Sequence, residues 1–303
     1  MKTFKIEDLS TLFKITFNEW LDKDPFRQSA VIAYYAIFSI PGLLVLIIAI
    51  AGYFFGQEVV NQNLIAQISD TIGSETALQI QEVLSKSTTE KSTAWGSLIG
   101  ITILLVGATG VFVELQKTLN LIWNVKVKPQ NGVWLIIKAR LFSFGLILAI
   151  AFLLTISLVI STALVAVSNY IQFESTQLMM TIYSILNFII SLSVISALFA
   201  MIFKILPDAK IQWKHVWLGS LVTGILFTIG KMALAYYFGK AEPASVYGAA
   251  GSIILILLWV SYSSMILFFG AEFTAAFAKM YSGKIPPTAL AKVEVPSATE
   301  KTM

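Results

Sequence analysis

Three ionisable residues, Glu114, Lys231 and Glu272, interrupt long apolar runs of the chain. Lys231 is the only formal charge in residues 216–238, and Glu272 stands in the run FFGAEFTAAFAK. A charged side chain at the centre of a membrane helix costs about 2.5–3.5 kcal/mol on insertion scales. Such residues often mark a solute or ion pathway, so these three are the first candidates for a functional site.

The predicted depth of Lys231 leaves two interpretations open. Counted from Val216, Lys231 lies about 22 Å along its helix, in the outer part of a hydrocarbon core about 30 Å thick. Its ammonium group could reach the outer surface as an anchor. Helical side chains lean toward the N-terminus of their helix, here the inner side, so Lys231 could equally line a site.

The two glutamates differ in their local partners. Glu114 precedes Lys117 by three residues, a spacing that favours a local ion pair. Glu272 has no basic residue within four positions, and its depth differs from that of Lys231 by about 10 Å. Its carboxyl group could be protonated, face a cavity or pair with a cytoplasmic arginine such as Arg140. Proton coupling through Glu272 is therefore a hypothesis.

Further candidates lie at polar or helix-breaking positions. The run AYYAIFSIPGLL contains Tyr34, Pro41 and Gly42. Proline removes a helical hydrogen bond, and the freed carbonyls need partners at membrane depth. The pair predicts either a broken helix lining a transport site or a packing kink. Asn187 shares a helix face with two serines, and its amide near the midplane needs partners.

Composition shows which elements must position these residues. The chain of 303 residues is 57% hydrophobic and only 13% charged, with a mean hydropathy of +0.79. Soluble domains carry about 25% charged residues, so the fold class is all-α, a polytopic membrane protein. Six apolar runs are long enough to span a bilayer. They are residues 30–55, 95–113, 141–167, 179–203, 216–238 and 252–277.

The distribution of basic residues predicts the orientation. Of the 21 lysines and arginines, 17 fall before the first span, after the sixth, or in the loops on that same side. The positive-inside rule therefore places both termini in the cytoplasm. The chain divides into an N-terminal segment (1–28), a six-helix transmembrane domain (29–279) and a disordered cytoplasmic tail (280–303).

Two segments outside the spans have helical patterns. The outer loop, residues 56–93, predicts one or two short amphipathic helices over the outer mouth. In the N-terminal segment, apolar residues recur every three or four positions, at Ile6, Leu9, Phe13, Phe17 and Trp20. This pattern indicates an amphipathic helix that lies in the inner membrane interface or packs on the protein's own cytoplasmic loops.

The sequence lacks the residues that several kinds of chemistry require. The chain has no cysteine and one histidine, His215, so neither thiol chemistry nor a histidine-rich metal site is expected. No phosphate-binding loop of the GxxxxGK[ST] type occurs. Trp213, Lys214 and Trp217 together suit a membrane boundary better than a nucleic-acid surface. We therefore expect no enzyme activity, no cofactor, no metal and no nucleic-acid partner.

Four stretches carry a resemblance to a known family. They are DPFRQSAVIAYYAIFSIPGLL, GATGVFVELQKTLNLIWNV, LPDAKIQWKHVWLGSLVTGILFTIGK and YGAAGSIILILLWVSYSSMILFFGAEF. Together they resemble the YihY/BrkB family of bacterial membrane proteins, once labelled ribonuclease BN. The resemblance implies six spans, the bacterial inner membrane and a transporter linked to the bacterial envelope. Pro41–Gly42, Glu114 with Asn120 and Trp123, and residues 270–273 coincide with the family pattern.

Three functions are compatible with these features. The first is a transporter or exporter of a small organic solute or amphiphile through a polar cleft in the bundle. The second is a flippase or scramblase for an envelope lipid, with Lys231 meeting an anionic headgroup. The third is a non-transporting membrane scaffold. Membrane lipids are expected partners in all three, and the sequence is compatible with a homo-oligomer.

Overall fold

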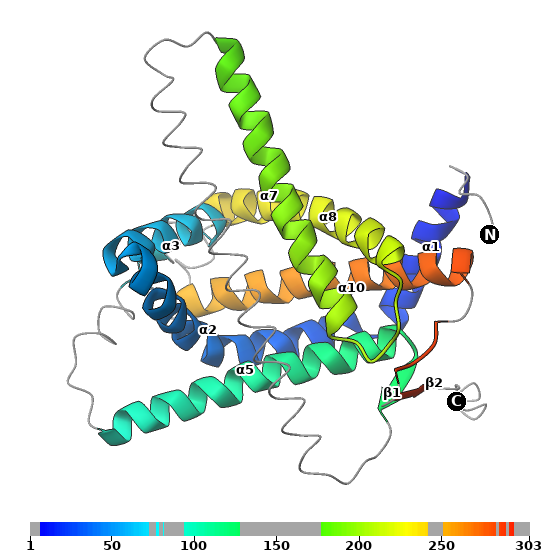
Figure 1. Cartoon of the computed structure of the whole chain (residues 1–303), viewed down its shortest axis with the longest axis horizontal. Helices are drawn as coiled ribbons and strands as arrows, with labels where there is room; N and C mark the ends of the chain where they lie inside the picture. The colour runs from blue at the N-terminus through cyan, green and yellow to red at the C-terminus, as the bar shows by residue number, and fades with distance from the viewer. Residues whose placement is uncertain are drawn as a thin grey trace.

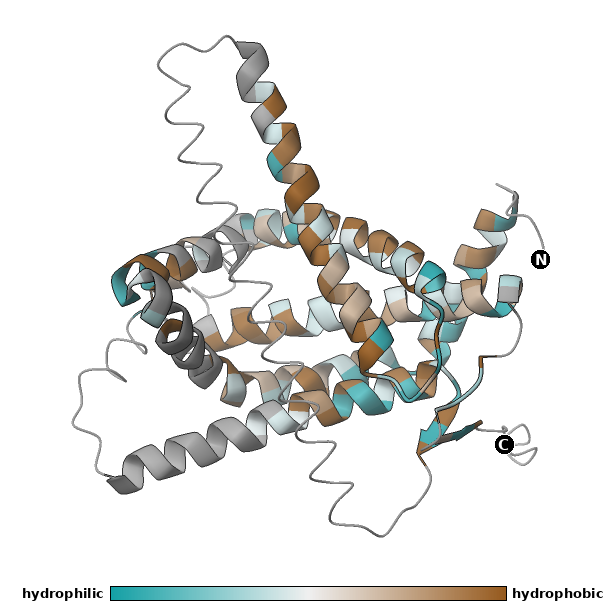
Figure 2. Ribbon diagram, viewed as in Figure 1, coloured by the Kyte–Doolittle hydropathy of each residue, from teal (hydrophilic) through white to brown (hydrophobic). Residues whose placement is uncertain are grey.

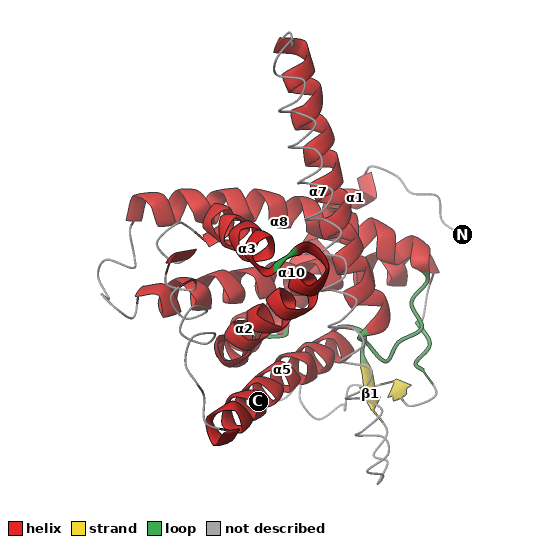
Figure 3. Cartoon of the chain, turned by 60° about the vertical axis from the view of Figure 1, so that its left-hand side comes forward, coloured by secondary structure: helices red, strands yellow, loops and turns green. Residues whose placement is uncertain are grey.

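The protein is almost entirely helical in a computed structural model that describes residues 7–72, 77–78, 81, 94–127, 177–241, 251–282, 285–288 and 291–293 (Figure 3). The helices are α1 (Glu7–Asp22), α2 (Pro25–Phe55), α3 (Gln57–Ile72), α5 (Ala94–Ile122), α7 (Gln177–Ile205), α8 (Trp213–Ala241) and α10 (Gly251–Ser282) (Figure 1). The third predicted span, residues 141–167, lies outside the described residues.

Within those ranges, three helices are long and apolar enough to cross a membrane. The qualifying segments are Ser184–Ile205 of α7, Trp213–Phe238 of α8 and Ile253–Tyr281 of α10. Figure 2 shows apolar residues along most of their coloured length. They coincide with the fourth, fifth and sixth predicted spans, because a run of about 20 apolar residues satisfies its backbone within lipid only as a helix.

Helix α10 lies at the centre of the described bundle and packs against α1, α2 and α8. Helix α5 packs on α2, and α7 packs on α8. The N-terminal half of α7 projects away from the other described helices (Figures 1 and 3). Large apolar side chains are exposed on it, at Ile182, Ile185, Leu186, Phe188 and Ile189. In a bilayer this surface would lie in an apolar environment, which removes the cost of exposing it.

Helices α8 and α10 cross at two reciprocal contacts. A Cβ atom at Gly219 would overlap the side chain of Thr274, and one at Gly270 would overlap that of Thr223. Each threonine hydroxyl donates to the carbonyl four residues earlier in its own helix, Thr223 to Gly219 at 2.6 Å and Thr274 to Gly270 at 2.7 Å. Small residues thus let the two backbones approach closely, as is usual between membrane helices.

A sharp corner ends α2 and starts α3. Gly56 has φ of 87°, and its N–H donates to the Gly52 carbonyl at 2.9 Å. Glycine reaches this positive φ without a steric penalty, which suits it to the residue after a helix. Helix α3 therefore begins at Gln57, within the predicted outer loop. Helix α2 itself is helical through Pro41 and Gly42, so the structure has no break at these residues.

The segment after α5 pairs with the segment after α10 in a two-stranded sheet. We call this sheet, together with the α7–α8 turn bonded to it, the clasp. Strand β1 (Val125–Val127) pairs antiparallel with β2 (Ala291–Val293), with Val125 opposite Val293. Asn124, which turns the chain from α5 into β1, has φ of 51°, a conformation that asparagine tolerates better than most residues.

The turn between α7 and α8 joins the same clasp. Lys210 N donates to the Pro286 carbonyl and Thr288 N to the Asp208 carbonyl, both at 2.9 Å. The sequence predicts a disordered tail from residue 280, whereas α10 continues to Ser282 and residues 285–288 and 291–293 are held by these backbone bonds.

Candidate functional site

The turn between α1 and α2 brings a lysine to the side of α10. Proline cannot continue α1 but fits the first turn of the next helix, so Pro25 begins α2. Before it, Asp24 has φ of 52°, and its N–H donates to the Leu21 carbonyl at 3.1 Å. Gln28 Nε2 donates to the Lys23 carbonyl at 2.6 Å. These bonds fix the short turn in which Lys23 lies.

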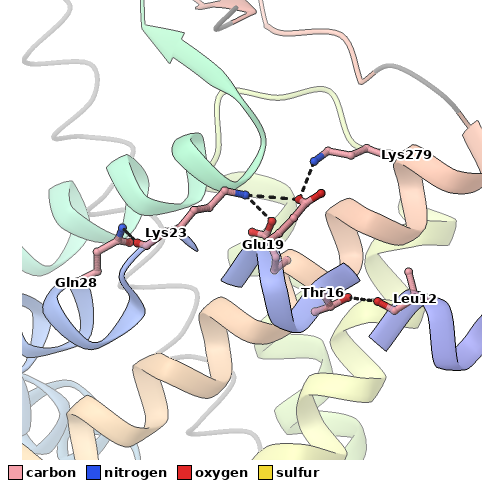
Figure 4. Close-up of polar contacts among 7 residues, drawn as sticks. Leu12, Thr16, Glu19, Lys23, Gln28 and Lys279 are labelled. Carbon is pink, nitrogen blue, oxygen red and sulfur yellow. Dashed lines mark hydrogen bonds and ion pairs between the residues drawn. The ribbon is translucent and has the colours of Figure 1, made fainter. Parts of the chain in front are cut away.

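Helix α1 packs on α10. Leu12 is buried together with Phe273 and Ala276, and the buried Thr16 hydroxyl donates to the Leu12 carbonyl at 2.8 Å (Figure 4). The ring of Phe13 lies 5.4 Å from that of Phe273. In the described part of the chain, α1 thus packs on a helix that is long enough to span the membrane.

Four charged residues form an ion cluster where α1 meets α10: Glu19, Lys23, Glu272 and Lys279 (Figure 4). Lys23 Nζ donates to Glu272 Oε1 and lies 3.8 Å from Glu19 Oε2. Lys279 Nζ donates to Glu19 Oε2 at 3.0 Å. Two carboxyl and two ammonium groups thus come together, which reduces the cost of placing charge in an apolar surrounding.

Burial within the ion cluster is uneven. The Glu272 side chain is fully buried (0% exposed), whereas that of Lys23 is 18% exposed. Glu272 Oε2 has no hydrogen-bond partner among the described residues. A buried carboxylate accepts several hydrogen bonds when satisfied, so this oxygen retains unused capacity inside the protein.

The ion cluster changes the pKa of Glu19, which lies in α1 and outside the spanning helices. Burial by itself raises the pKa of Glu19, but the adjacent Glu272 carboxyl group and the charges of Lys279 and Lys23 lower it by more. The pKa of Glu19 consequently lies below its usual value. Glu19 therefore stays ionised in the folded protein and holds the two lysines in place.

The other predicted charges lie elsewhere. The expected local pair is present, with Lys117 Nζ 3.3 Å from Glu114 Oε2, but the Lys117 side chain is 68% exposed, so this is a surface pair. Lys231 is half-buried, between the buried Gly230 and the exposed Met232. It forms no ion pair with another described residue.

The remaining candidates do not join the ion cluster. Tyr34 is 59% exposed on α2, and its ring contacts that of Phe38 at 5.3 Å between centroids. Asn187 is exposed on the projecting half of α7. Pro41 and Gly42 lie within α2, more than three turns beyond Gln28. Of the candidates whose side chains are described, only Glu272 is fully buried.

Sequence reasoning missed the partner of Glu272. The sequence left open a protonated carboxyl group, a cavity or a cytoplasmic arginine such as Arg140, which lies outside the described residues. The observed partner is Lys23. The two residues are 249 positions apart in the chain, and local spacing carries no signal at that separation. An amphipathic N-terminal helix whose charges are acidic as well as basic was the available hint.

Sequence reasoning also missed a second set of polar contacts, which centres on Asp208. Asp208, in the turn after α7, accepts hydrogen bonds from Asn120 Nδ2 at 2.9 Å and Gln116 Nε2 at 3.1 Å. The Asp208 N–H donates to Asn120 Oδ1 at 2.7 Å. These bonds tie the end of α5 to the α7–α8 turn and so hold the clasp together.

Long apolar helices, close glycine crossings and a buried ion cluster define a helical membrane protein. The chain matches the family described as "Virulence factor BrkB" over residues 16–294, and it belongs to that family. The matched region begins within α1 and ends just after β2, so it contains every residue of the ion cluster. The resemblance found in the sequence is thereby confirmed.

Curated relatives carry the name UPF0761 membrane protein. One from Verminephrobacter eiseniae is 27% identical over 61% of this chain and 43% of its own length. One from Saccharophagus degradans is 23% identical over 89% of this chain and 60% of its own, and one from Vibrio vulnificus 26% over 82% and 76%. The chain thus spans about half the length of the first two relatives. No solved structure matches it.

Proposed function

We propose that this protein transports a small organic solute or amphiphile across the bacterial inner membrane, through a polar cleft in a six-helix bundle. The observation that carries the proposal is the fully buried Glu272 carboxyl group in a helix long enough to span the bilayer. Ionisable residues in such helices are costly, and they commonly serve solute or proton pathways.

The direction of the described helices supports the six-span topology. The start of α2 and the ends of α5, α7 and α10 meet at the clasp and the ion cluster, as does the start of α8. Helix α2 runs opposite to α5, and α7, α8 and α10 alternate in turn, whereas α5 and α7 run in the same direction. The proposal therefore includes one further crossing between α5 and α7, the predicted span at residues 141–167. With the excess of basic residues on that side, the proposal includes cytoplasmic termini.

A lipid flippase or scramblase is the second candidate. Lys231 is half-buried while Ile229 and Met232 on the same stretch of α8 are 58% and 69% exposed. A cationic group at the edge of a lipid-facing surface could meet an anionic headgroup in the membrane. In the third candidate, a scaffold, the ion cluster and Lys231 would only support the fold.

Profiling of cells tests the three candidates together. Cells lacking the protein are compared with cells that express wild type, Glu272→Gln or Lys231→Met, by untargeted measurement of cytosolic solutes and envelope lipids. We expect a solute that accumulates without the protein and is cleared by wild type but not by Glu272→Gln. A shift confined to envelope lipids and dependent on Lys231 would favour the flippase, and no shift in either pool would favour the scaffold.

A further inference from the structure

Two buried polar atoms of opposite character have no partner where α1 meets α10. Glu272 Oε2 is an acceptor and Trp20 Nε1 is a donor, and neither forms a hydrogen bond with any described residue. Trp20 stands between Glu19 and Lys23 on the same helix end. Unsatisfied buried polar atoms are uncommon in native proteins and often mark a place that binds a ligand.

Aromatic rings from three helices surround the same junction. Trp20 lies edge-to-face on Phe269 at 5.8 Å and near Phe26 at 6.0 Å. Phe13 contacts Phe269 at 6.3 Å and Phe273 at 5.4 Å. Phe269 precedes Glu272 by three residues, which places both on one face of α10, and Phe273 follows it directly.

The outer edge of this aromatic cluster is open. Phe13 is 38%, Phe17 50% and Phe26 58% exposed, although large aromatic side chains gain most from burial. Ring contacts therefore lead from Phe273, the residue after Glu272, through Phe13 to the outside of the bundle, at a helix that is long enough to span the membrane.

We propose that Glu272 and the aromatic residues around it bind the ammonium group of an organic amine with an apolar tail, and that Lys23 is the internal cation that this amine displaces. A fully buried carboxylate attracts a cation strongly, and aromatic faces attract organic ammonium groups. Lys23 is itself a primary ammonium on an apolar chain. Its contact with Glu272 Oε1 shows that the site accommodates this chemistry.

Displacement leaves Lys23 with a second partner. Its Nζ already lies 3.8 Å from Glu19 Oε2, so a small rotation transfers the lysine to Glu19, which it then shares with Lys279. The apolar tail of the amine then lies along the open aromatic edge. This inference rests on the proposed function, because the amine is one class of the solute or amphiphile that we expect to be transported.

Titration calorimetry on the purified protein tests the site with three probes of one chain length: hexylamine, hexanol and hexanoate. We expect hexylamine alone to bind. Lys23→Met should bind hexylamine about tenfold more tightly, because a tethered competitor is removed. The double variant Lys23→Met/Glu272→Gln keeps the junction neutral, and we expect it to fold and to bind no hexylamine.

Three results would overturn the inference: equal binding of hexanol, no gain in affinity for folded Lys23→Met, or full hexylamine binding by the double variant. If Lys23→Met alone does not fold, the comparison of wild type with the double variant decides. Failure here is distinct from failure of transport. If profiling shows a change in a cytosolic solute but the protein binds no hexylamine, only this inference is contradicted. If the protein binds hexylamine but no solute level changes, only the transport proposal is contradicted.

Discussion

Lys23 and Glu272, which are 249 residues apart in the chain, form an ion pair that joins the turn between α1 and α2 to the spanning helix α10. The pair links a turn set by Pro25 to a carboxyl group that is fully buried in α10. A buried polar group without a partner is expensive, so the position of α1 on α10 and the burial of Glu272 depend on each other.

The first prediction concerns pH and follows from Glu19. Its pKa is lower in the folded protein than in the unfolded chain, where it is about 4.3. Glu19 therefore contributes stability that is fully present above pH 4.3 and is lost as the pH falls through the folded pKa. We expect the thermal midpoint of wild type to fall below about pH 4 by more than that of Glu19→Gln, as measured by thermal unfolding in detergent.

Glu19→Gln should also flatten the acid limb of the stability curve, since the neutral amide cannot titrate. Glu58→Gln is the matched control, because Glu58 lies on the exposed start of α3. Equal acid sensitivity of Glu19→Gln and wild type would contradict the role of Glu19 in holding the two lysines.

The second prediction concerns the crossing of α8 and α10. Gly270→Ala places a methyl group where the Thr223 side chain lies. Overpacking of this kind costs about 1–3 kcal/mol, and thermal unfolding should show the loss. Adding Thr223→Gly should recover part of it, because the obstructing atoms are removed.

Leu221→Ala on the exposed face of α8 serves as the control for this crossing. It should change stability by less than Gly270→Ala. An unchanged midpoint for Gly270→Ala would mean that the helices do not approach as closely as the structure indicates.

The third prediction concerns the clasp. Asp208→Ala removes the acceptor of both Asn120 and Gln116, and leaving such donors unpaired costs about 1–3 kcal/mol. We expect faster cleavage of the chain after α10 in limited proteolysis, because the α7–α8 turn holds Pro286 and Thr288. Lys117→Ala on the exposed face of α5 should leave cleavage unchanged, and equal rates for the two variants would count against the clasp.

The sequence predicted the parts of this structure that follow from short-range physics. Apolar runs of about 20 residues gave α7, α8 and α10, because lipid demands internally bonded backbone. The spacing of Glu114 and Lys117 gave their pair. Glu272 stood out because a carboxylate in an apolar run is costly wherever the chain folds.

Long-range pairings were beyond that reasoning. Lys23 reaches Glu272 only because Pro25 ends α1 where it does and α1 then packs on α10. The hydrogen bonds of Asp208 to Asn120 likewise join positions 88 apart. Tyr34 and Asn187 resembled site residues by type, but the structure places them on exposed surfaces.

The most direct test of the account is a double-mutant cycle on Lys23 and Glu272, followed by thermal and denaturant unfolding. Breaking a buried pair by removing one partner costs about 3–5 kcal/mol, whereas removing both charges costs much less. We therefore expect Lys23→Met and Glu272→Gln each to lower stability strongly, and the double variant to recover most of the loss. Lys117→Met, from the exposed pair with Glu114, should have almost no effect. Additive losses in the double variant would contradict the pairing that holds Glu272 in place.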